Sequence, residues 1–291
     1  MMHALIDAWL RRKWRPQQGH DAFAGRQALA VVTGGSEGIG LELARELARR
    51  GHALLLVARK EASLERAAEA IRREHGGRVE TLALDLTHAE AGAILAERVH
   101  VLGAYVDVLV NNAAIGLSGA FTSMDRQDMR RLVELNVASL SELTHRFLPD
   151  MVLRGRGGVI NVTSLGCYAP GPWAALYFAS KAYVLSLTEA VRHEVAGQGV
   201  RVMALVPGPV ATGFHAKMGS DASFYLWCIP VYSARTVARS ALRAYMMGRR
   251  VKVVGVLNEV SALGMRMLPH LLLLPVIGFL FRRRDEGKTD V

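Results

Sequence analysis

From Gln27 onward, short runs of apolar residues alternate with longer amphipathic stretches. Seven runs are rich in Val, Leu and Ala and almost continuously apolar, which is typical of strands covered on both faces of a sheet: Ala28–Val32, Ala53–Val57, Val79–Leu84, Val106–Val110, Val159–Val162, Val200–Val206 and Val251–Val256. Helical patterns lie between them, at Leu41–Arg50, Ser63–Arg73, Arg130–Leu153 and Ala182–Val195. This alternation predicts an α/β fold with a doubly wound parallel sheet of about seven strands.

Both ends of the chain depart from this alternation. In residues 1–26, Ala4, Leu5, Ala8 and Trp9 can share a helical face, and Pro16 begins a polar stretch that is typical of a linker. The basic residues there follow the apolar stretch rather than precede it, so we expect no signal peptide. We predict an N-terminal basic appendage at 1–26, a single catalytic domain at 27–257 and an apolar and basic C-terminal segment at 258–291.

The C-terminal segment contains the run Leu268–Phe281, which is apolar apart from His270. A helix that spans a bilayer needs about 20 apolar residues. This run is shorter and contains Pro269 and Pro275, so we expect no transmembrane span. Three roles remain open: a lid over an apolar substrate, a contact between subunits, or a peripheral foot on a membrane.

The net charge of +10 raises the question of nucleic-acid binding. Most of the excess arginine is spread over predicted helices and no nucleic-acid-binding module is present, so we expect no such partner. Two basic clusters, Arg11–Lys13 with Arg15 and Arg282–Arg284, adjoin apolar or aromatic residues, which suits an anionic membrane surface as well as ordinary solvated ends. Cys167 and Cys228 form no disulfide framework or metal-binding spacing. We therefore predict a cytoplasmic protein without a metal site.

A glycine-rich loop, Thr33–Gly40, follows the first predicted strand and leads directly into a helix. Glycines let the backbone turn sharply and approach a pyrophosphate, which sits on the N-terminus of the helix. Such a turn can also bind nothing, but the order of strand, loop and helix favours a dinucleotide site. Its candidate residues are Gly34, Ser36, Glu37, Gly38, Ile39 and Gly40.

The end of the second strand bears on the choice between NAD and NADP. An acidic residue there would bind the ribose 2′-hydroxyl and repel a 2′-phosphate. The sequence has Ala58 at that position, followed by Arg59, whose guanidinium suits a phosphate. Glu37 in the glycine loop counts against this interpretation, because NADP enzymes often place a neutral or basic residue near that position. On balance the sequence favours NADP(H) over NAD(H).

Tyr177 and Lys181 form a YxxxK motif at the start of a predicted helix. A separation of four residues places both side chains on one face, where an ammonium can stabilise a phenolate. A half-buried tyrosine beside a lysine that reaches solvent would look the same. Ser164 ends the strand-like run before this helix, and it precedes Tyr177 by 13 residues. Asn136 lies among apolar positions of the preceding helix, where it could also satisfy a buried backbone group.

From Gln27 to Val256 these motifs, in this order, resemble the short-chain dehydrogenase/reductase family. The glycine loop has its TGxxxGxG spacing, Asn111–Ala114 matches its Asn-Asn-Ala-Gly with Ala114 for the glycine, and Pro207–Thr212 matches its PGxVxT. The resemblance implies a Rossmann-type sheet and a homodimer or homotetramer. It also implies cofactor contacts from Asp85, Leu86, Asn112, Ala113, Tyr177, Lys181, Pro207, Gly208, Val210 and Thr212.

The resemblance further implies a catalytic set of Asn136, Ser164, Tyr177 and Lys181. In this scheme Tyr177 protonates the carbonyl oxygen, Ser164 polarises it, Lys181 lowers the pKa of Tyr177 and binds the nicotinamide ribose, and Asn136 anchors a water of the proton relay. The hydride chemistry belongs to the cofactor.

The leading hypothesis is an NADPH-dependent reductase, or the reverse dehydrogenase, for an apolar ketone or aldehyde. We expect its substrate walls in Cys167–Trp173 and Gly213–Tyr232, where Phe214, Met218, Phe224, Tyr225, Leu226 and Trp227 gather. Two alternatives stay open. A catalytically silent NADP-binding scaffold would not need the full catalytic set, and an NAD-dependent alcohol dehydrogenase is disfavoured by Arg59.

Overall fold

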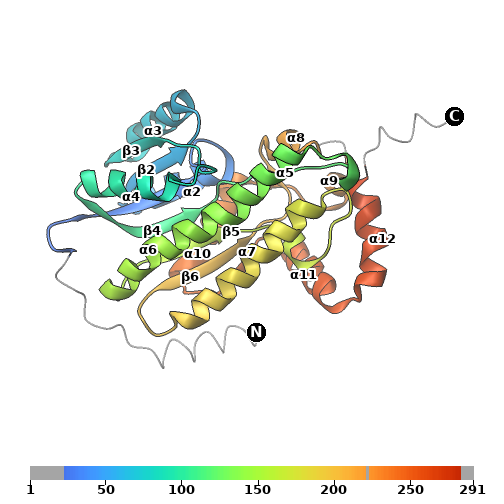
Figure 1. The fold of residues 1–291 in the computed structure, drawn as a ribbon. Coiled ribbons are helices and arrows are strands. Elements are labelled where there is room, and N and C mark those ends of the chain that lie inside the picture. Colours follow the sequence, from blue (N-terminus) through green and yellow to red (C-terminus); the bar gives the residue numbers. More distant parts are fainter. Residues whose placement is uncertain (1–22, 221–222, 283–291) are drawn as a thin grey trace.

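The computed structural model describes residues 23–220 and 223–282 (Figure 1). Its centre is a seven-stranded parallel sheet with the strand order β3-β2-β1-β4-β5-β6-β9. The strands are β1 (Gln27–Thr33), β2 (Ala53–Ala58), β3 (Val79–Ala83), β4 (Ala104–Asn111), β5 (Gly158–Val162), β6 (Arg201–Val206) and β9 (Val251–Val253). The predicted doubly wound Rossmann-type fold is confirmed. The last strand ends earlier than predicted, because Gly255 has φ +95° and turns the chain into the next helix.

Helices cover both faces of the sheet, which explains the continuous apolar runs of the strands. Along β1, Ala30 and Val32 face a core with α2, α3 and α10, whereas Leu29 and Val31 face a core with α4 and α6. The helices are α2 (Gly38–Ala48), α3 (Glu61–His75), α4 (Ala91–Val101), α5 (Arg126–Val133), α6 (Leu140–Arg154), α7 (Ala175–Glu194), α8 (Phe214–Met218), α9 (Tyr225–Cys228), α10 (Ala234–Met246), α11 (Val256–Met267) and α12 (His270–Phe281).

The helix predicted at Arg130–Leu153 is continuous but not regular. It consists of α5, a π-helical segment at Glu134–Ser139, and α6. A π-helical turn inserts an extra residue and rotates the side chains that follow it. Asn136 lies in this segment and is buried.

The right-hand end of the molecule in Figure 1 is formed by segments that lie outside the two helical layers of the sheet. There α8, α9 and α12 lie close to the start of α7. Val210–Ala211 (β7) pairs in parallel with Tyr232–Ser233 (β8). Leu273 and Ile277 of α12 share an apolar cluster with Tyr177 and Phe178. Among residues 23–220 and 223–282, no helix has both the length and the apolar character needed to cross a membrane.

Candidate active site

The glycine loop between β1 and α2 forms a cradle in which added side chains would collide with neighbouring loops. Gly34 and Gly38 have φ +63° and +58°, which favour glycine. A Cβ on Gly34 would lie 2.7 Å from Asn112 Nδ2, and one on Gly38 would lie 3.3 Å from Thr212 Cγ2. The first amides of α2 have no partner within the helix, so the cradle presents N–H donors. It therefore fits the pyrophosphate of a dinucleotide.

Hydrogen bonds fix the glycine loop to the segment that follows β4. Thr33 Oγ1 accepts from the amides of Asn112 (3.0 Å) and Ala113 (3.1 Å) and donates to the Val110 carbonyl. Asn112 Nδ2 donates to the carbonyls of Thr33 (3.0 Å) and Gly34 (3.2 Å). Asn112 thus shapes the cradle through its side chain. Thr33 was not among the predicted site residues, although its place at the end of β1 could have indicated it.

The loop after β6 completes the cradle. Val210 is buried, and Thr212 approaches Gly38. The Pro207 carbonyl accepts from the amide of Leu165, next to Ser164. Gly208 lies against the Asn258 side chain of α11, where a Cβ would not fit. The structure therefore brings the predicted residues of this loop beside both the glycine loop and Ser164.

Arg59 and Asp85 lie at the ends of the adjacent strands β2 and β3. The Arg59 side chain is exposed, and Leu86 is buried. Asp85 accepts from Thr87 Oγ1 (2.8 Å) and Arg131 Nη2 (2.9 Å). Burial alone would raise the pKa of Asp85, but the Thr87 hydrogen bonds and the charges of Arg131 and Arg59 outweigh it and lower the pKa. Arg131, on α5, is a basic neighbour that sequence analysis missed, because only the fold brings α5 to β3.

Glu37 of the glycine loop forms an ion pair with Lys217 of α8. Both side chains are largely exposed, and they are 180 residues apart in the chain. The ammonium of Lys217 offsets the negative charge that Glu37 places in the cradle. The pair also joins α8 to the glycine loop, a contact that local sequence patterns do not reveal.

Tyr177 and Lys181 are buried on one face of α7, and Ser164 faces them from the end of β5. The Lys181 nitrogen lies 5.7 Å from the centre of the Tyr177 ring and donates to the Val162 carbonyl at 3.1 Å. Burial lowers the pKa of Lys181 to about 8. Burial raises the pKa of Tyr177 above its usual range, and a side-chain hydrogen bond with Ser164 offsets this in part. The structure thus brings the three predicted residues together, but the Tyr177 pKa is raised rather than lowered, because desolvation dominates.

Asn136 connects the π-helical segment to this cluster. Its Oδ1 accepts from the Ile115 amide at 3.0 Å, and its Nδ2 donates to the Ile115 carbonyl at 2.8 Å and to Ser180 Oγ at 3.1 Å. Ser180 Oγ in turn donates to the Tyr177 carbonyl at 2.7 Å. Asn136 therefore holds the chain after β4 against α7.

An apolar wall stands beside Tyr177. It includes Ala169, Phe214 and Met218 from the two predicted wall segments, and Leu273, Ile277 and Phe281 from α12. Phe281 stacks on Tyr225, with ring centres 4.3 Å apart, and Phe279 stacks on Phe224. The Tyr225 hydroxyl also lies 2.5 Å from His215 Nδ1, and burial lowers the pKa of His215. The apolar C-terminal run therefore packs against the predicted substrate side of the site.

Other parts of the predicted walls lie elsewhere. Cys167 belongs to a separate apolar cluster, and burial raises the pKa of its thiol to about 12, which disfavours the reactive thiolate. Trp227 is 76% exposed.

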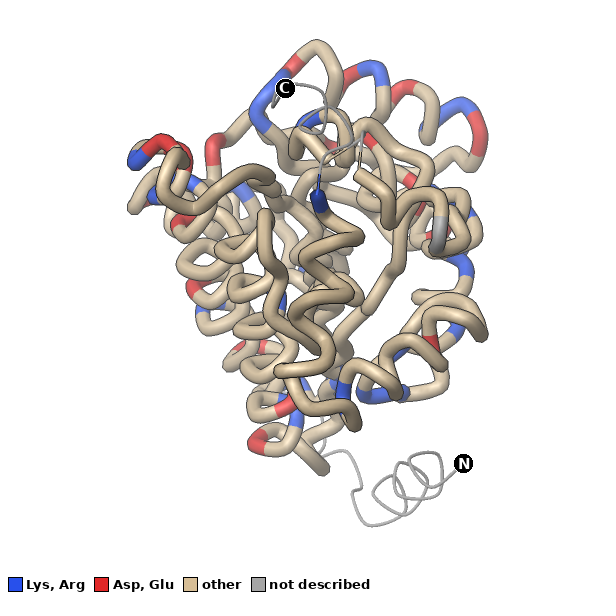
Figure 2. The backbone as a smooth tube through the Cα atoms, turned by 90° about the vertical axis from the view of Figure 1, so that its right-hand side faces the viewer, with Lys and Arg blue, Asp and Glu red and all other residues tan. Residues whose placement is uncertain are grey.

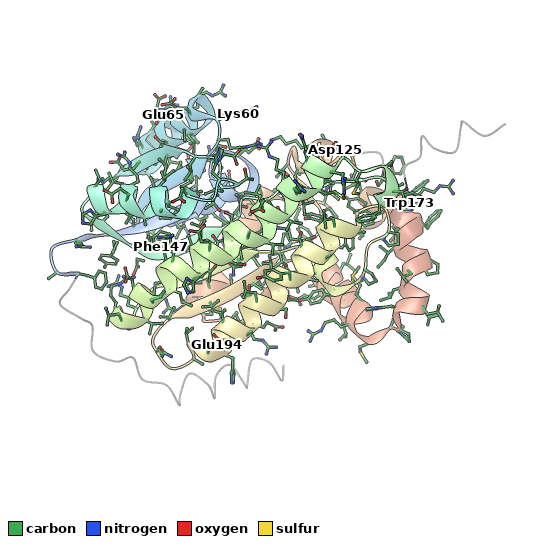
Figure 3. All side chains as sticks on the ribbon, in the orientation of Figure 1. Lys60, Glu65, Asp125, Phe147, Trp173 and Glu194 are labelled. Carbon is green, nitrogen blue, oxygen red and sulfur yellow. The ribbon has the colours of Figure 1, made fainter. Side chains whose placement is uncertain are left out.

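Trp173, with φ +66°, lies in the loop beside α12 (Figure 3). Within the described parts of the chain, this is the one residue other than glycine with positive φ.

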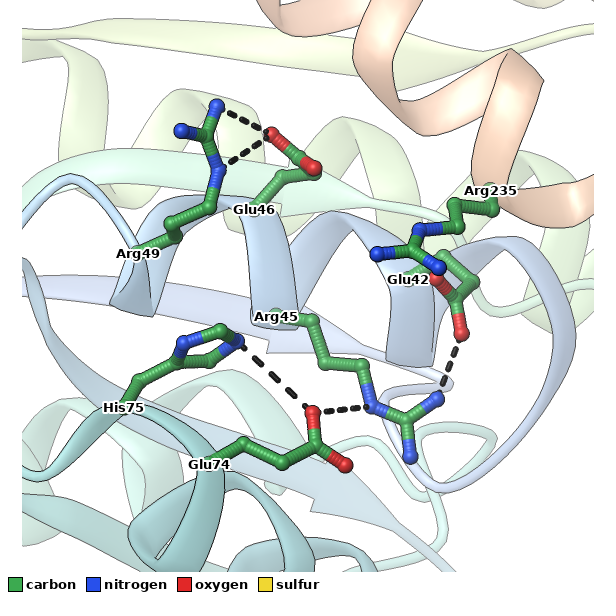
Figure 4. A pocket seen from close by; sticks show the side chains of 7 residues that line it. All are labelled: Glu42, Arg45, Glu46, Arg49, Glu74, His75 and Arg235. Atoms are coloured by element: carbon green, nitrogen blue, oxygen red, sulfur yellow. Dashed lines mark hydrogen bonds and ion pairs between the residues drawn. The ribbon is translucent and has the colours of Figure 1, made fainter.

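A hollow of about 320 Å³ between α2, α3 and α10 lies apart from these residues (Figure 4). Its basic and acidic side chains pair with one another, as in Arg45 with Glu42 and Glu74, and Arg49 with Glu46. These ion pairs brace α2 and α3. No group of three or more side chains suited to a metal ion occurs in residues 23–220 and 223–282.

Comparisons with known proteins identify the class of protein. Residues 28–223 match the family model for short chain dehydrogenase, so the chain belongs to that family, and it is an oxidoreductase acting on CH–OH or C=O groups. A galactitol 2-dehydrogenase of Cereibacter sphaeroides is 38% identical over 66% of this chain and 74% of its own length. A very-long-chain 3-oxoacyl-CoA reductase of Bos taurus is 31% identical over 67% of this chain and 64% of its own length.

Solved structures agree with this assignment. A short-chain dehydrogenase from Sphingobium yanoikuyae, in complex with NADPH, superposes with a TM-score of 0.73 at 30% identity. The match covers 82% of this chain and 92% of that protein.

Proposed function

We propose that this protein is an NADPH-dependent reductase that converts an apolar ketone or aldehyde to its alcohol, and that it catalyses the reverse reaction under oxidising conditions. The observation that carries the proposal is the set of buried Tyr177 and Lys181 with half-buried Ser164, between a dinucleotide cradle and an apolar wall. The cradle, the proton-transfer groups and the wall are the three parts that this reaction requires.

The proposed mechanism assigns one task to each side chain. When bound, the nicotinamide cofactor supplies the hydride. Tyr177 keeps its proton in the buried site, because burial raises its pKa, and donates it to the substrate oxygen as negative charge develops there. Ser164, which is hydrogen-bonded to Tyr177, donates to the same oxygen. Lys181 is charged at neutral pH, since its pKa is near 8, and it stabilises the phenolate that proton donation leaves.

Asn136 acts as a positioning residue in this proposal. Its hydrogen bonds to both backbone groups of Ile115 and to Ser180 fix α7 relative to the loop after β4. Because Tyr177 lies on α7, the same hydrogen bonds hold its side chain in place relative to the glycine loop. An amide that is itself held so firmly can also orient the water of a proton relay, as the family resemblance implies.

Three charges support the preference for NADP(H). Arg59 is exposed at the end of β2, at the place where a 2′-phosphate would lie. Lys217 neutralises Glu37, which would otherwise repel that phosphate. Arg131 engages Asp85 and so reduces the remaining negative charge nearby.

The apolar substrate is inferred from the wall alone. The two relatives above act, by their names, on a polyol and on a very-long-chain acyl thioester, so their names favour no single substrate class. Phe214, Met218 and Ile277 give this site no polar partner for a sugar hydroxyl. We also propose a homodimer or homotetramer, in which the exposed Leu153 and Tyr183 of α6 and α7 would be covered.

The test measures NADPH oxidation over a panel of apolar ketones and aldehydes, together with NADPH binding by fluorescence. Tyr177→Phe is expected to lose turnover at least about 10³-fold and to bind NADPH nearly as wild type, because only the transferable proton is removed. Lys181→Ala should lose both turnover and NADPH affinity. Tyr245→Phe, which alters a buried tyrosine of α10, is the matched control and should keep turnover.

Wild-type rates in Tyr177→Phe would overturn the proposed chemistry. A wild-type protein that binds NADPH but reduces nothing on the panel would instead favour a catalytically silent NADP-binding scaffold.

A further inference from the structure

Helices α11 and α12 form a hairpin whose outer side is apolar. On α11 the exposed side chains include Val256, Val260, Leu263 and Met267, which recur at helical spacing. The tip of the hairpin, residues 266–272, is exposed throughout, and Met267 and Leu271 are 74% and 82% exposed. In Figure 2 the hairpin turned toward the viewer is almost free of charged residues. From this surface we infer that the tip and outer side of the hairpin dock on an anionic lipid bilayer.

The hairpin is anchored to the domain through its opposite side. Asn258 and Ala262 of α11 are buried, as are Leu273 and Ile277 of α12. The Asn258 side chain donates to the Val254 carbonyl at 2.6 Å. The exposed apolar residues therefore belong to a fixed surface, and a contiguous apolar surface of this kind marks a binding site.

The charges around this surface complement anionic headgroups. Between Val260 and Arg282 the sequence contains no Asp or Glu, and Glu259, just before it, pairs with Lys252 at 2.9 Å. Arg266 is the first residue of the tip, where its guanidinium lies 5.6 Å from the centre of the Tyr168 ring, and Arg282 follows α12. Arg283 and Arg284 come next in the sequence, before Asp285 and Glu286. Basic residues beside an apolar surface are the combination that binds anionic membranes peripherally.

A lipid surface fits these charges better than a second copy of the chain does. A two-fold contact through the tip would bring Arg266 of each copy toward the other, and the one carboxylate of the hairpin, Glu259, already pairs with Lys252 at 2.9 Å. Phosphate headgroups supply that missing negative charge. With 12 residues each, α11 and α12 are about 18 Å long, too short to span a bilayer but long enough to lie at its surface.

The inference rests on the surface of the hairpin and not on the proposed reaction. It does have a consequence for the site, because Leu273 and Ile277 extend from the same helix into the cluster around Tyr177. Docking would place that apolar wall next to lipid.

The experiment is vesicle flotation of the full-length protein, with phosphatidylcholine vesicles that contain or lack phosphatidylglycerol, at low and high salt. Met267→Asp and Leu271→Asp each replace a tip residue that the site does not use, and each should lower partitioning about 10-fold or more. Arg266→Gln should lower it about fivefold at low salt and less at high salt. Val101→Asp is the matched control, because Val101 is 65% exposed at the end of α4, on the far side of the molecule from α12 (Figure 1).

Flotation that requires phosphatidylglycerol and is lost in the tip variants, but not in Val101→Asp, supports the inference. Two results overturn it: no flotation of the wild type, or flotation that the tip variants retain. If the wild type does not float and a tip variant converts an oligomer to monomers, the surface belongs to a contact with a second copy. NADPH binding by the variants, measured in parallel, shows that they are folded and keeps this test separate from that of the reaction.

Discussion

At the scale of single residues, the site depends on charges whose neighbours come from other elements. Lys181 donates to the Val162 carbonyl in a buried place, and burial lowers its pKa to about 8. Glu37 is tolerated beside a dinucleotide cradle because Lys217 pairs with it. Arg59 differs from Glu37, because its guanidinium is exposed and can contact the phosphate of a ligand.

Cofactor preference should therefore follow Arg59. Arg59→Ala is expected to weaken NADPH binding by about 1.5–3 kcal/mol, which is about 10-fold or more, and to leave NADH binding little changed. Titration calorimetry with both cofactors measures this. Lys60→Ala removes the next charge along the chain, also exposed, and should shift both affinities much less. If Arg59→Ala lost the same affinity for NADPH and for NADH, Arg59 would not be a contact of the 2′-phosphate.

At the scale of elements, the π-helical segment between α5 and α6 supplies the hydrogen bond from Asn136 to Ser180 of α7. From this segment the Asn136 side chain bonds both backbone groups of Ile115, which lies beyond the end of β4. Sequence periodicity treats the whole stretch as one regular helix, but Leu132 of α5 packs in the cluster around Tyr177, whereas Leu143 of α6 packs against the sheet.

Asn136→Ala should leave the Ile115 N–H and C=O without their partners in a part-buried place. We expect a loss of about 1–3 kcal/mol in the free energy of unfolding, measured by urea denaturation, and a lower kcat with less change in NADPH affinity. Ser180→Ala is the control, since it removes one Asn136 contact and keeps both bonds to Ile115. An Asn136→Ala protein as stable as Ser180→Ala would show that the bonds to Ile115 contribute little.

At the scale of the whole molecule, Glu46 joins elements from both ends of the domain. Its side chain is 5% exposed and pairs with Arg49 and Arg50 of the α2 region and with Arg239 of α10, which is 193 residues away. Burial alone would raise the pKa of Glu46, but the hydrogen bonds from Arg50, Arg49 and Arg239 outweigh it and lower the pKa to about 2.

A carboxylate with a lowered pKa stabilises the fold above its unfolded pKa and loses that effect as the pH falls through its folded pKa. Glu46→Gln should therefore have a free energy of unfolding about 2 kcal/mol lower than wild type at neutral pH. The loss is not larger because solvent partly screens the arginine partners. The difference should shrink as the pH falls from 4.5 toward about 2. Urea unfolding at several pH values tests this, with Glu42→Gln, whose pairing with Arg45 is local to α2, as the control. A difference that does not change with pH would rule out the charge as its origin.

Local patterns in the sequence determined the sheet, its covering helices, the glycine loop and the spacing of Ser164, Tyr177 and Lys181. These features depend on residues close together in the chain, through the periodicity of apolar positions and the turn chemistry of glycine. The strand limits were right within a few residues. The predicted helix at the N-terminus lies outside the described residues and stays a prediction.

Contacts between distant segments were decided only by the tertiary structure. Lys217 beside Glu37, Arg131 beside Asp85 and Arg239 beside Glu46 each join residues that no sequence window contains. The apolar run at the C-terminus left a lid, a subunit contact and a membrane foot open, because periodicity cannot say which side of a uniformly apolar helix finds a partner. The fold divides that run into an inner side, with Leu273 and Ile277 against the Tyr177 cluster, and an outer side that includes Leu271 and faces solvent. That division depends on where the end of the chain packs, and packing depends on surfaces that exist only after the sheet has formed.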